Sequence, residues 1–221
     1  MQAFSGYDEA QTQEYGERRE KLKLGGHICK ILEVRTEAYT SKDGKPFEML
    51  VMKIDIEEPD EQAGFYTRRF KEEAEKDAMN AKWKGYYRLT VPTDSSEDYV
   101  KSKFKTFTTS IEKSNPGYKW NWQEATLVGK VFGGIFALKQ IELTQGMNAG
   151  KIVDYTELRF ARSTEKVAEV EIPNVRLLDG TYMSYDDYLE MKEEKGDIIS
   201  DLASKGQPVD IIENDNDDLP F

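Results

Sequence analysis

Period-two alternation of apolar and polar residues is the dominant pattern in the first quarter of the chain. Residues 27–39 and 47–56 each place apolar side chains mostly on one parity, which is typical of half-buried strands. The run 41–46 between them carries Asp-Gly at its centre, a strong turn signal. The two segments therefore predict a β-hairpin.

Two shorter segments and a helix follow. Residues 64–70 predict a third strand, and the aromatic, basic stretch 83–92 is also strand-like. Asp94 is the expected N-cap of the helix, because Glu97 three residues later completes a capping-box pattern. The helix presents one apolar stripe, formed by Val100, Phe104, Phe107 and Ile111.

The pattern returns to strands after this helix. Residues 127–143 and 152–161 are strand-like, and Gly133-Gly134 predicts a bulge or bend in the first of them. The resulting order, with an insertion around 71–92, is three strands, a helix and two strands. It predicts a mainly β protein, an OB-fold five-stranded Greek-key barrel with its helix between strands 3 and 4.

The barrel is expected to occupy residues 25–178, after a polar N-terminal arm at 1–24 and before an acidic tail at 179–221. Residues 172–178 are expected to lie back on the barrel. Within the tail, 182–189 predict a short helix capped by Ser184, and a flexible linker is expected beyond Gly196.

Composition excludes several classes of protein. The chain of 221 residues has one cysteine and one histidine, Cys29 and His27, so neither a disulfide framework nor a Cys/His zinc site is expected. We expect Cys29 to be a small buried side chain and His27 to be structural or at the surface. No signal peptide, membrane span or cofactor-binding motif is evident, which favours a cytoplasmic protein without a cofactor.

Charge is distributed very unevenly along the chain. The formal net charge is -11, but residues 179–221 hold 13 acidic and 3 basic residues. Residues 64–163 hold 17 basic and 12 acidic residues. A nearly neutral body with a basic centre and an acidic tail is compatible with a nucleic-acid-binding core.

Aromatic and basic residues alternate within this basic centre. Single-stranded DNA binding requires aromatic faces for the bases and cations for the phosphates. We expect Trp83, Tyr86 and Trp120 to be exposed, and leave open whether Phe70 and Phe132 are core residues. The predicted nucleic-acid-binding residues are Arg68, Arg69, Phe70, Lys82, Trp83, Lys84, Tyr86, Tyr87, Arg88, Trp120, Trp122, Lys130 and Phe132.

The last eight residues, 214–221, form an acidic stalk that ends in an apolar tripeptide. This end resembles the acidic tip of bacterial and phage single-stranded DNA-binding proteins, which finish in several Asp residues, an apolar residue, Pro and Phe. The resemblance implies that the terminal Phe ring fills an apolar pocket on a partner while the carboxylates meet basic groups. The residues implied in partner binding are Asp215, Asp217, Asp218, Leu219, Pro220 and Phe221.

A second resemblance covers residues 24–178. The runs 104–118 and 127–134 are similar to a family of small proteins encoded by bacteriophages and prophages of Gram-positive bacteria, some of them described as single-stranded DNA-binding proteins. That family implies a DNA-binding role in a bacterial host cell, without a short signature for the binding residues.

The sequence thus predicts a non-enzymatic protein that binds single-stranded DNA without sequence preference. Its tip would recruit replication, recombination or repair proteins, and a homo-oligomer stays open. One alternative is an adaptor whose small β-barrel binds protein instead of DNA. Another is a metal-dependent hydrolase or nuclease, for which Glu72, Glu73, Glu75 and Asp77 are the candidate ligands.

Overall fold

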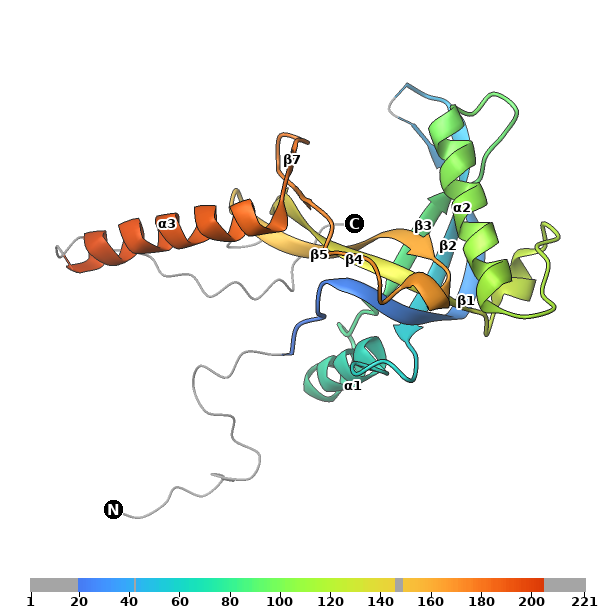
Figure 1. The fold of residues 1–221 in the computed structure, drawn as a ribbon, viewed down its shortest axis with the longest axis horizontal. Helices are drawn as coiled ribbons and strands as arrows, with labels where there is room; N and C mark the ends of the chain where they lie inside the picture. The colour runs from blue at the N-terminus through green and yellow to red at the C-terminus, as the bar shows by residue number, and fades with distance from the viewer. Residues whose placement is uncertain (1–19, 42, 146–148, 205–221) are drawn as a thin grey trace, which may run out of the picture.

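The protein is mainly β, with one mixed open sheet at its centre. The computed structural model describes residues 20–41, 43–145 and 149–204. Within these residues there are seven strands and three α-helices, and the sheet order is β3-β2-β1-β4-β6-β7, with β5 also paired to β4 (Figure 1). Every pairing is antiparallel except that of β4 with β6.

The first two strands form the predicted hairpin. β1 spans Gly25–Thr40 and β2 spans Pro46–Ile56, and the turn between them places Gly44 at φ 75°. The register shifts once, between Ile31 and Glu33. β1 is long enough to pair with β4 through its first half and with β2 through most of its length.

The predicted third strand at 64–70 is wrong, because these residues begin helix α1, Phe65–Lys76. The Asp55 carboxylate at the end of β2 accepts bonds from the backbone nitrogens of Tyr66 and Thr67, at 2.9 and 3.2 Å. A carboxylate there satisfies N–H groups that a first helical turn leaves unpaired. The third strand is instead β3, Tyr86–Thr90, inside the segment that the sequence assigned to an insertion.

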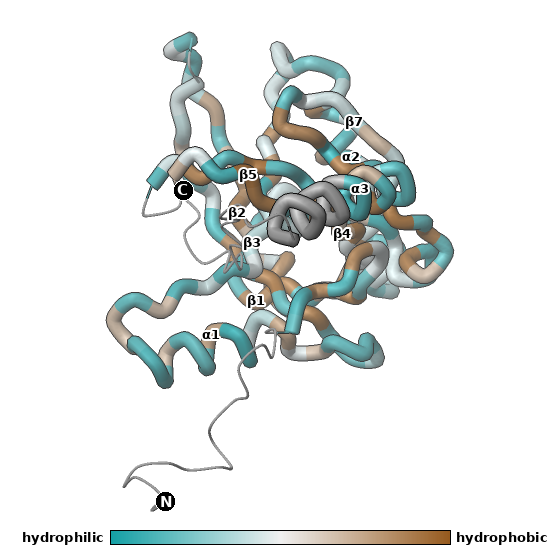
Figure 2. Tube along the Cα trace, turned by 90° about the vertical axis from the view of Figure 1, so that its left-hand side faces the viewer, coloured by the Kyte–Doolittle hydropathy of each residue, from teal (hydrophilic) through white to brown (hydrophobic). Residues whose placement is uncertain are grey.

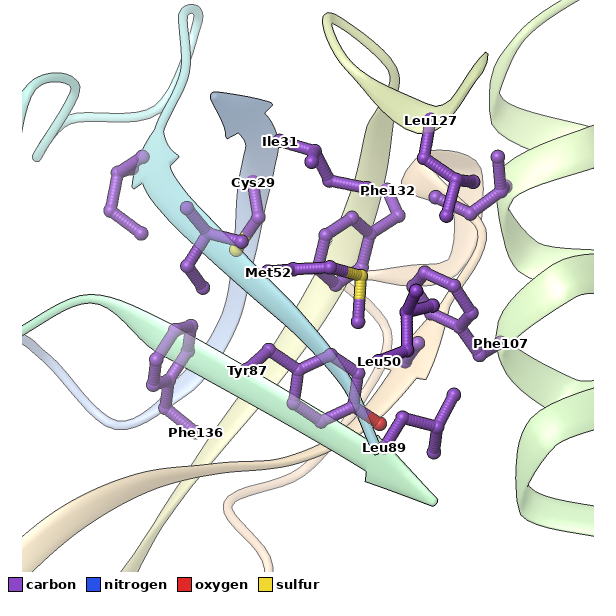
Figure 3. Packing of buried hydrophobic residues seen from close by; sticks show 14 of the residues in the cluster. Cys29, Ile31, Leu50, Met52, Tyr87, Leu89, Phe107, Leu127, Phe132 and Phe136 are labelled. Carbon is purple, nitrogen blue, oxygen red and sulfur yellow. The ribbon is translucent and has the colours of Figure 1, made fainter. Parts of the chain in front are cut away.

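Helix α2, Asp98–Ser114, carries the predicted apolar stripe. Its N-terminus lies later than expected, with Glu97 rather than Asp94 at the N-cap and no side-chain cap bond. Phe104, Phe107 and Ile111 are buried on the inner side of the sheet, and Figure 3 shows Phe107 reaching from the helix toward the strands. This stripe helps to build the main core.

The fourth and fifth strands follow the sequence prediction closely. The short η1, Glu124–Leu127, leads into β4, Val131–Glu142, which pairs with β5, Ile152–Arg162. The register shift lies between Ile135 and Phe136 rather than at the glycine pair. Gly133 is required for another reason, since a Cβ there would lie 3.0 Å from Val167.

Residues 163–183, which we call the strap, run back over the outer side of β4. The strap contains η2, Thr164–Lys166, β6, Val175–Arg176, and β7, Tyr182–Met183. β6 pairs with β4 and Val175 is fully buried, which confirms that residues 172–178 lie back on the fold.

Helix α3, Tyr185–Ser204, follows the strap and extends away from the rest of the fold (Figure 1). The backbone nitrogen of Asp187 donates to the Ser184 hydroxyl at 3.1 Å, which confirms the expected cap. The helix is longer than predicted, so the expected linker is wrong for residues 197–204.

The predicted arm begins to pack before its end. Leu22 is buried in the main cluster, and Gln62 donates to the Lys21 carbonyl oxygen at 2.9 Å. His27 is also buried, with Nδ1 at 3.0 Å from the Asp60 carboxylate and Nε2 at 2.9 Å from the Lys23 carbonyl oxygen. Cys29 is fully buried as expected, and burial raises the pKa of its thiol.

Hydropathy agrees with the arrangement of the elements, since α1 is mostly hydrophilic while the strands carry the apolar segments (Figure 2).

Candidate nucleic-acid interface

The outer face of β1, β2 and β3 is the candidate site. Its central row places Arg35 of β1, Val51 of β2 and Arg88 of β3 side by side in the register. The neighbouring row contains Lys53 and Tyr86. We define the outer strip as Arg35, Tyr39, Phe47, Lys53, Tyr86 and Arg88, all on the parity opposite to the core.

Tyr86 lies at the centre of the outer strip between two guanidinium groups. The Cζ atoms of Arg35 and Arg88 lie 5.8 and 5.3 Å from the centroid of its ring. Guanidinium groups at this distance attract the ring electrostatically and hold its orientation. The outer strip therefore places an aromatic ring next to two cations.

The hairpin end of the strip carries a second aromatic pair. Tyr39 and Phe47 stack with their ring centroids 5.8 Å apart and an interplanar angle of 24°. The Tyr39 hydroxyl donates to the Glu37 carboxylate, which raises the pKa of Tyr39 and lowers that of Glu37. Because the pair lies where β1 and β2 approach their turn, it extends the strip to the end of the hairpin.

The opposite end of the strip approaches helix α1. Lys53 Nζ lies 4.6 Å from the centroid of the Trp83 ring, and the Phe70 ring lies 5.8 Å from that of Trp83. Trp83 is only 9% exposed, and its indole N–H donates to the Gly85 carbonyl oxygen at 2.9 Å. The expectation that Trp83 is exposed is therefore wrong. Phe70, which was left open, is 36% exposed on α1.

Acidic side chains hold several of the cations in this region. Lys53 Nζ lies 2.8 Å from Glu33, Lys30 Nζ lies 3.0 Å from Glu57, and Arg35 pairs with Glu37. Surface ion pairs of this kind contribute about 0–1 kcal/mol each. A phosphate group can therefore replace a carboxylate at small cost.

The two predicted arginines of the supposed third strand anchor the N-terminal segment instead. Arg68 Nη2 lies 3.1 Å from the Glu20 carboxylate, and Arg69 Nη1 donates to the Glu20 carbonyl oxygen at 3.1 Å. Lys82 and Lys84 lie in the connection from α1 to β3, where Lys82 is exposed and Lys84 is partly buried. These four cations border the strip without lying on its strands.

Two of the predicted contact residues lie in the core. Tyr87 and Phe132 are 3% and 0% exposed, and their rings lie 6.2 Å apart inside the main cluster. Tyr87 has the inward parity of β3, next to the outward Tyr86 and Arg88. Both residues are therefore wrong as base-stacking side chains, because a buried ring offers no face to a base.

Trp120, Trp122 and Lys130 lie on the α2 side of the sheet, away from the outer strip. Trp120 was expected to be exposed but is partly buried against Phe104, while Trp122 is 64% exposed. Lys130 Nζ lies 4.9 Å from the centroid of the Tyr118 ring. The structure thus separates the predicted site into two surfaces.

Sequence reasoning missed four members of the outer strip, namely Arg35, Tyr39, Phe47 and Lys53. The signal was present, since all four have the outward parity of the two predicted hairpin strands. In the hairpin strands aromatic and basic residues are spread along the sequence, whereas residues 82–88 hold them in one dense run.

The remaining candidate residues are those of the C-terminal tip and the carboxylates of α1. The tip residues Asp215, Asp217, Asp218, Leu219, Pro220 and Phe221 lie outside the described residues. Glu72 and Glu75 are exposed on α1, while the Asp77 side chain accepts from the backbone nitrogen of Met79 at 3.1 Å.

In the described part of the chain, no three His, Cys, Asp or Glu side chains are placed to hold a metal ion. None of the described helices is long and apolar enough to cross a bilayer.

Comparison with known proteins does not extend this picture. No protein-family model matches the chain, and no curated protein matches it significantly. The candidate interface therefore depends on its own geometry.

Proposed function

We propose that this chain is a non-enzymatic protein that binds single-stranded DNA with little sequence preference through its outer strip. The observation that carries the proposal is the half-buried Tyr86 ring with the Arg35 and Arg88 guanidinium groups within 6 Å of its centroid, on the outward parity of the sheet. A stacked base contributes about 1–3 kcal/mol to binding, and stacking tolerates any base. The cations on both sides of the ring supply the phosphate contacts.

We propose further that the sheet closes as an OB-fold Greek-key barrel. β1 pairs with both β2 and β4, and α2 lies between β3 and β4 in the chain, as that fold requires. Closure would bring β3 beside β5. In this fold, strands 2 and 3 form the ligand-binding face, which is where the outer strip lies.

A fluorescently labelled oligo-dT titrated at low and high salt tests the proposal. Binding should be tight at low salt and weaken steeply as salt is added, because phosphate contacts release counterions. Tyr86→Ala should weaken binding by about 1–3 kcal/mol. Tyr182→Ala, which removes an exposed ring from β7, is the matched control and should bind like the wild type.

Absence of binding at low salt would overturn the proposal and favour the adaptor alternative. Magnesium-dependent cleavage of the oligonucleotide would instead favour the nuclease alternative. Equal losses for Tyr86→Ala and Tyr182→Ala would show that the outer strip is not the binding face.

The acidic tip is proposed to recruit replication, recombination or repair proteins in a bacterial host cell. A tethered tail also has a high effective concentration at the DNA-binding surface, so it competes with DNA. Deleting residues 215–221 should leave DNA affinity unchanged or raise it, while abolishing pull-down of the partner. A collapse of DNA affinity would show that the tail belongs to the binding site.

A further inference from the structure

Trp122 is a large, exposed aromatic side chain that the outer strip does not include. Its ring stacks on Phe104 of α2, with centroids 5.5 Å apart and an interplanar angle of 11°. Trp120 flanks it, with centroids 6.0 Å apart. Because Phe104 is buried in the core and covers one face of the indole, the 64% exposure of Trp122 leaves the other face to solvent. We call Phe104, Trp120 and Trp122 the Trp122 platform.

The loop that carries Trp122 is held firmly in place. Glu112 of α2 accepts bonds from Lys119 Nζ and from the backbone nitrogen of Trp120, at 3.0 and 3.1 Å. Asn115 bonds Val131 twice, donating to its carbonyl oxygen at 2.7 Å and accepting from its nitrogen at 3.1 Å. The position of Trp122 is therefore fixed before any ligand arrives, which reduces the ordering cost of binding.

The backbone at Trp122 is unusual. Its φ is 64°, and among the described residues it is the only non-glycine with a positive φ. The left-handed region costs an L-residue about 1–2 kcal/mol, and such strain persists where the surroundings impose it, often at functional sites. Here the Asn121 side chain imposes the turn by accepting from the backbone nitrogen of Gln123 at 3.2 Å.

The charge around the platform favours a polyanion. Helix α2 and the loop that follows it, residues 98–130, contain six lysines and three acidic residues. One lysine lies directly before Trp120 in the chain, and Lys130 closes the same loop. An exposed ring with cations around it is the combination that binds single-stranded nucleic acid by stacking and phosphate contacts.

From these observations we infer that the Trp122 platform is a second contact for single-stranded nucleic acid, separate from the outer strip. The inference rests on the proposed function and extends it. Phe107 of α2 packs at 5.8 Å on Tyr87, which points inward, whereas Tyr86 points outward. The platform and the strip therefore lie on opposite sides of β3. A single nucleic-acid strand can reach both surfaces only by passing around the protein.

With this arrangement, the contribution of Trp122 to affinity should depend on the length of the oligonucleotide. An oligo-dT of about 8 nucleotides fills a site of single-domain size, whereas about 30 nucleotides can reach both surfaces. For the long oligonucleotide, Trp122→Ala should lower affinity about tenfold, the equivalent of one stacked base. For the short one, bound at the strip, affinity should not change.

Two further variants control the experiment. Trp122→Phe retains an aromatic face and should keep most of the affinity, while Val128→Ala alters an exposed residue of the same loop and should have no effect. Trp122→Asn removes the ring but tolerates a positive φ, so it replaces Trp122→Ala if that variant fails to fold.

The outcomes separate the two proposals. If the wild type binds both oligonucleotides and Trp122→Ala binds them equally well, the second contact is wrong and the outer strip stands. If Trp122→Ala weakens both lengths equally, the two surfaces are not separate sites and the inference is again wrong. If the wild type binds neither length, the proposed function itself fails.

Discussion

The outer faces of the two halves of the sheet differ sharply. On β4 the outward side chains Ile135 and Ala137 are buried beneath the rest of the chain. On β1 and β3 the outward side chains Arg35 and Arg88 are exposed. We call these the covered half and the open half of the sheet.

The difference shows how side-chain chemistry and chain path act together. Where the outward residues are apolar they are buried, and the strap packs against the neighbouring glycines, with Val167 against Gly26 and Gly133. Where they are long and cationic, the two arginines stay exposed, although Val51 between them is almost fully buried. The aliphatic stems of such side chains shield apolar surface while their charges stay in water. The open half is therefore both stable and available for binding.

The largest expected effect comes from forcing the strap off the covered half. A Cβ at Gly26 would lie 2.0 Å from the Val167 carbonyl oxygen and 2.7 Å from its Cγ2. Backbone atoms cannot move aside cheaply, so Gly26→Ala should lower the free energy of unfolding by about 3 kcal/mol. Urea unfolding measures this directly.

Gly44→Ala provides the control for that substitution. Gly44 has a φ of 75° and nothing within 4 Å of an added Cβ, so only the backbone penalty of about 1–2 kcal/mol applies. Equal losses for the two variants would show that the strap contact does not stabilise the covered half.

An intermediate effect is expected when a cation is removed from the open half. Arg88→Gln should reduce the slope of log affinity for oligo-dT against log salt by about 0.7, because one phosphate contact is lost. Arg162→Gln is the matched control, since Arg162 lies on β5 in the covered half. An unchanged slope for Arg88→Gln, or an equal change in both, would remove the distinction between the halves.

The smallest effect concerns the attachment of α3 to the covered half. The Tyr188 hydroxyl bonds the Asp154 carboxylate and accepts from Gln140 Nε2 at 3.2 Å. Tyr188→Phe should therefore lower the free energy of unfolding by about 1 kcal/mol at neutral pH. Tyr185→Phe, one turn earlier in the same helix, serves as the control in the same urea measurement.

Tyr188→Phe should also change how the free energy of unfolding depends on pH above neutrality. Burial, and then the bond to Asp154, raise the pKa of Tyr188 above its ordinary value of 10.0. The unfolded chain therefore ionises first, so this stabilisation is complete below pH 10 and is lost as pH rises toward the folded pKa. Tyr188→Phe should lose less stability above about pH 10 than the wild type. Some loss should persist, because burial also raises the pKa of Tyr66 and Tyr155.

The sequence by itself determined the elements with regular periodicity. The hairpin strands, β4, β5 and the stripe of α2 were all predicted, because period-two and helical patterns record which side of an element meets the core. The same parity rule separates Tyr86 from the buried Tyr87. Its application to β1 and β2 would also have found Arg35 and Lys53.

Only the tertiary structure decided which faces stay open and which segments meet. The segment 64–70 lies in a helix whose first turn is capped by Asp55 from the preceding strand, a contact that the local pattern does not show. Trp83 became buried because α1 packs on one side of it and Lys53 approaches from another. Local patterns assign a side chain to a face, but whether that face is covered depends on long-range contacts such as the strap on Gly26. For the same reason, one predicted binding surface became two, on opposite sides of β3.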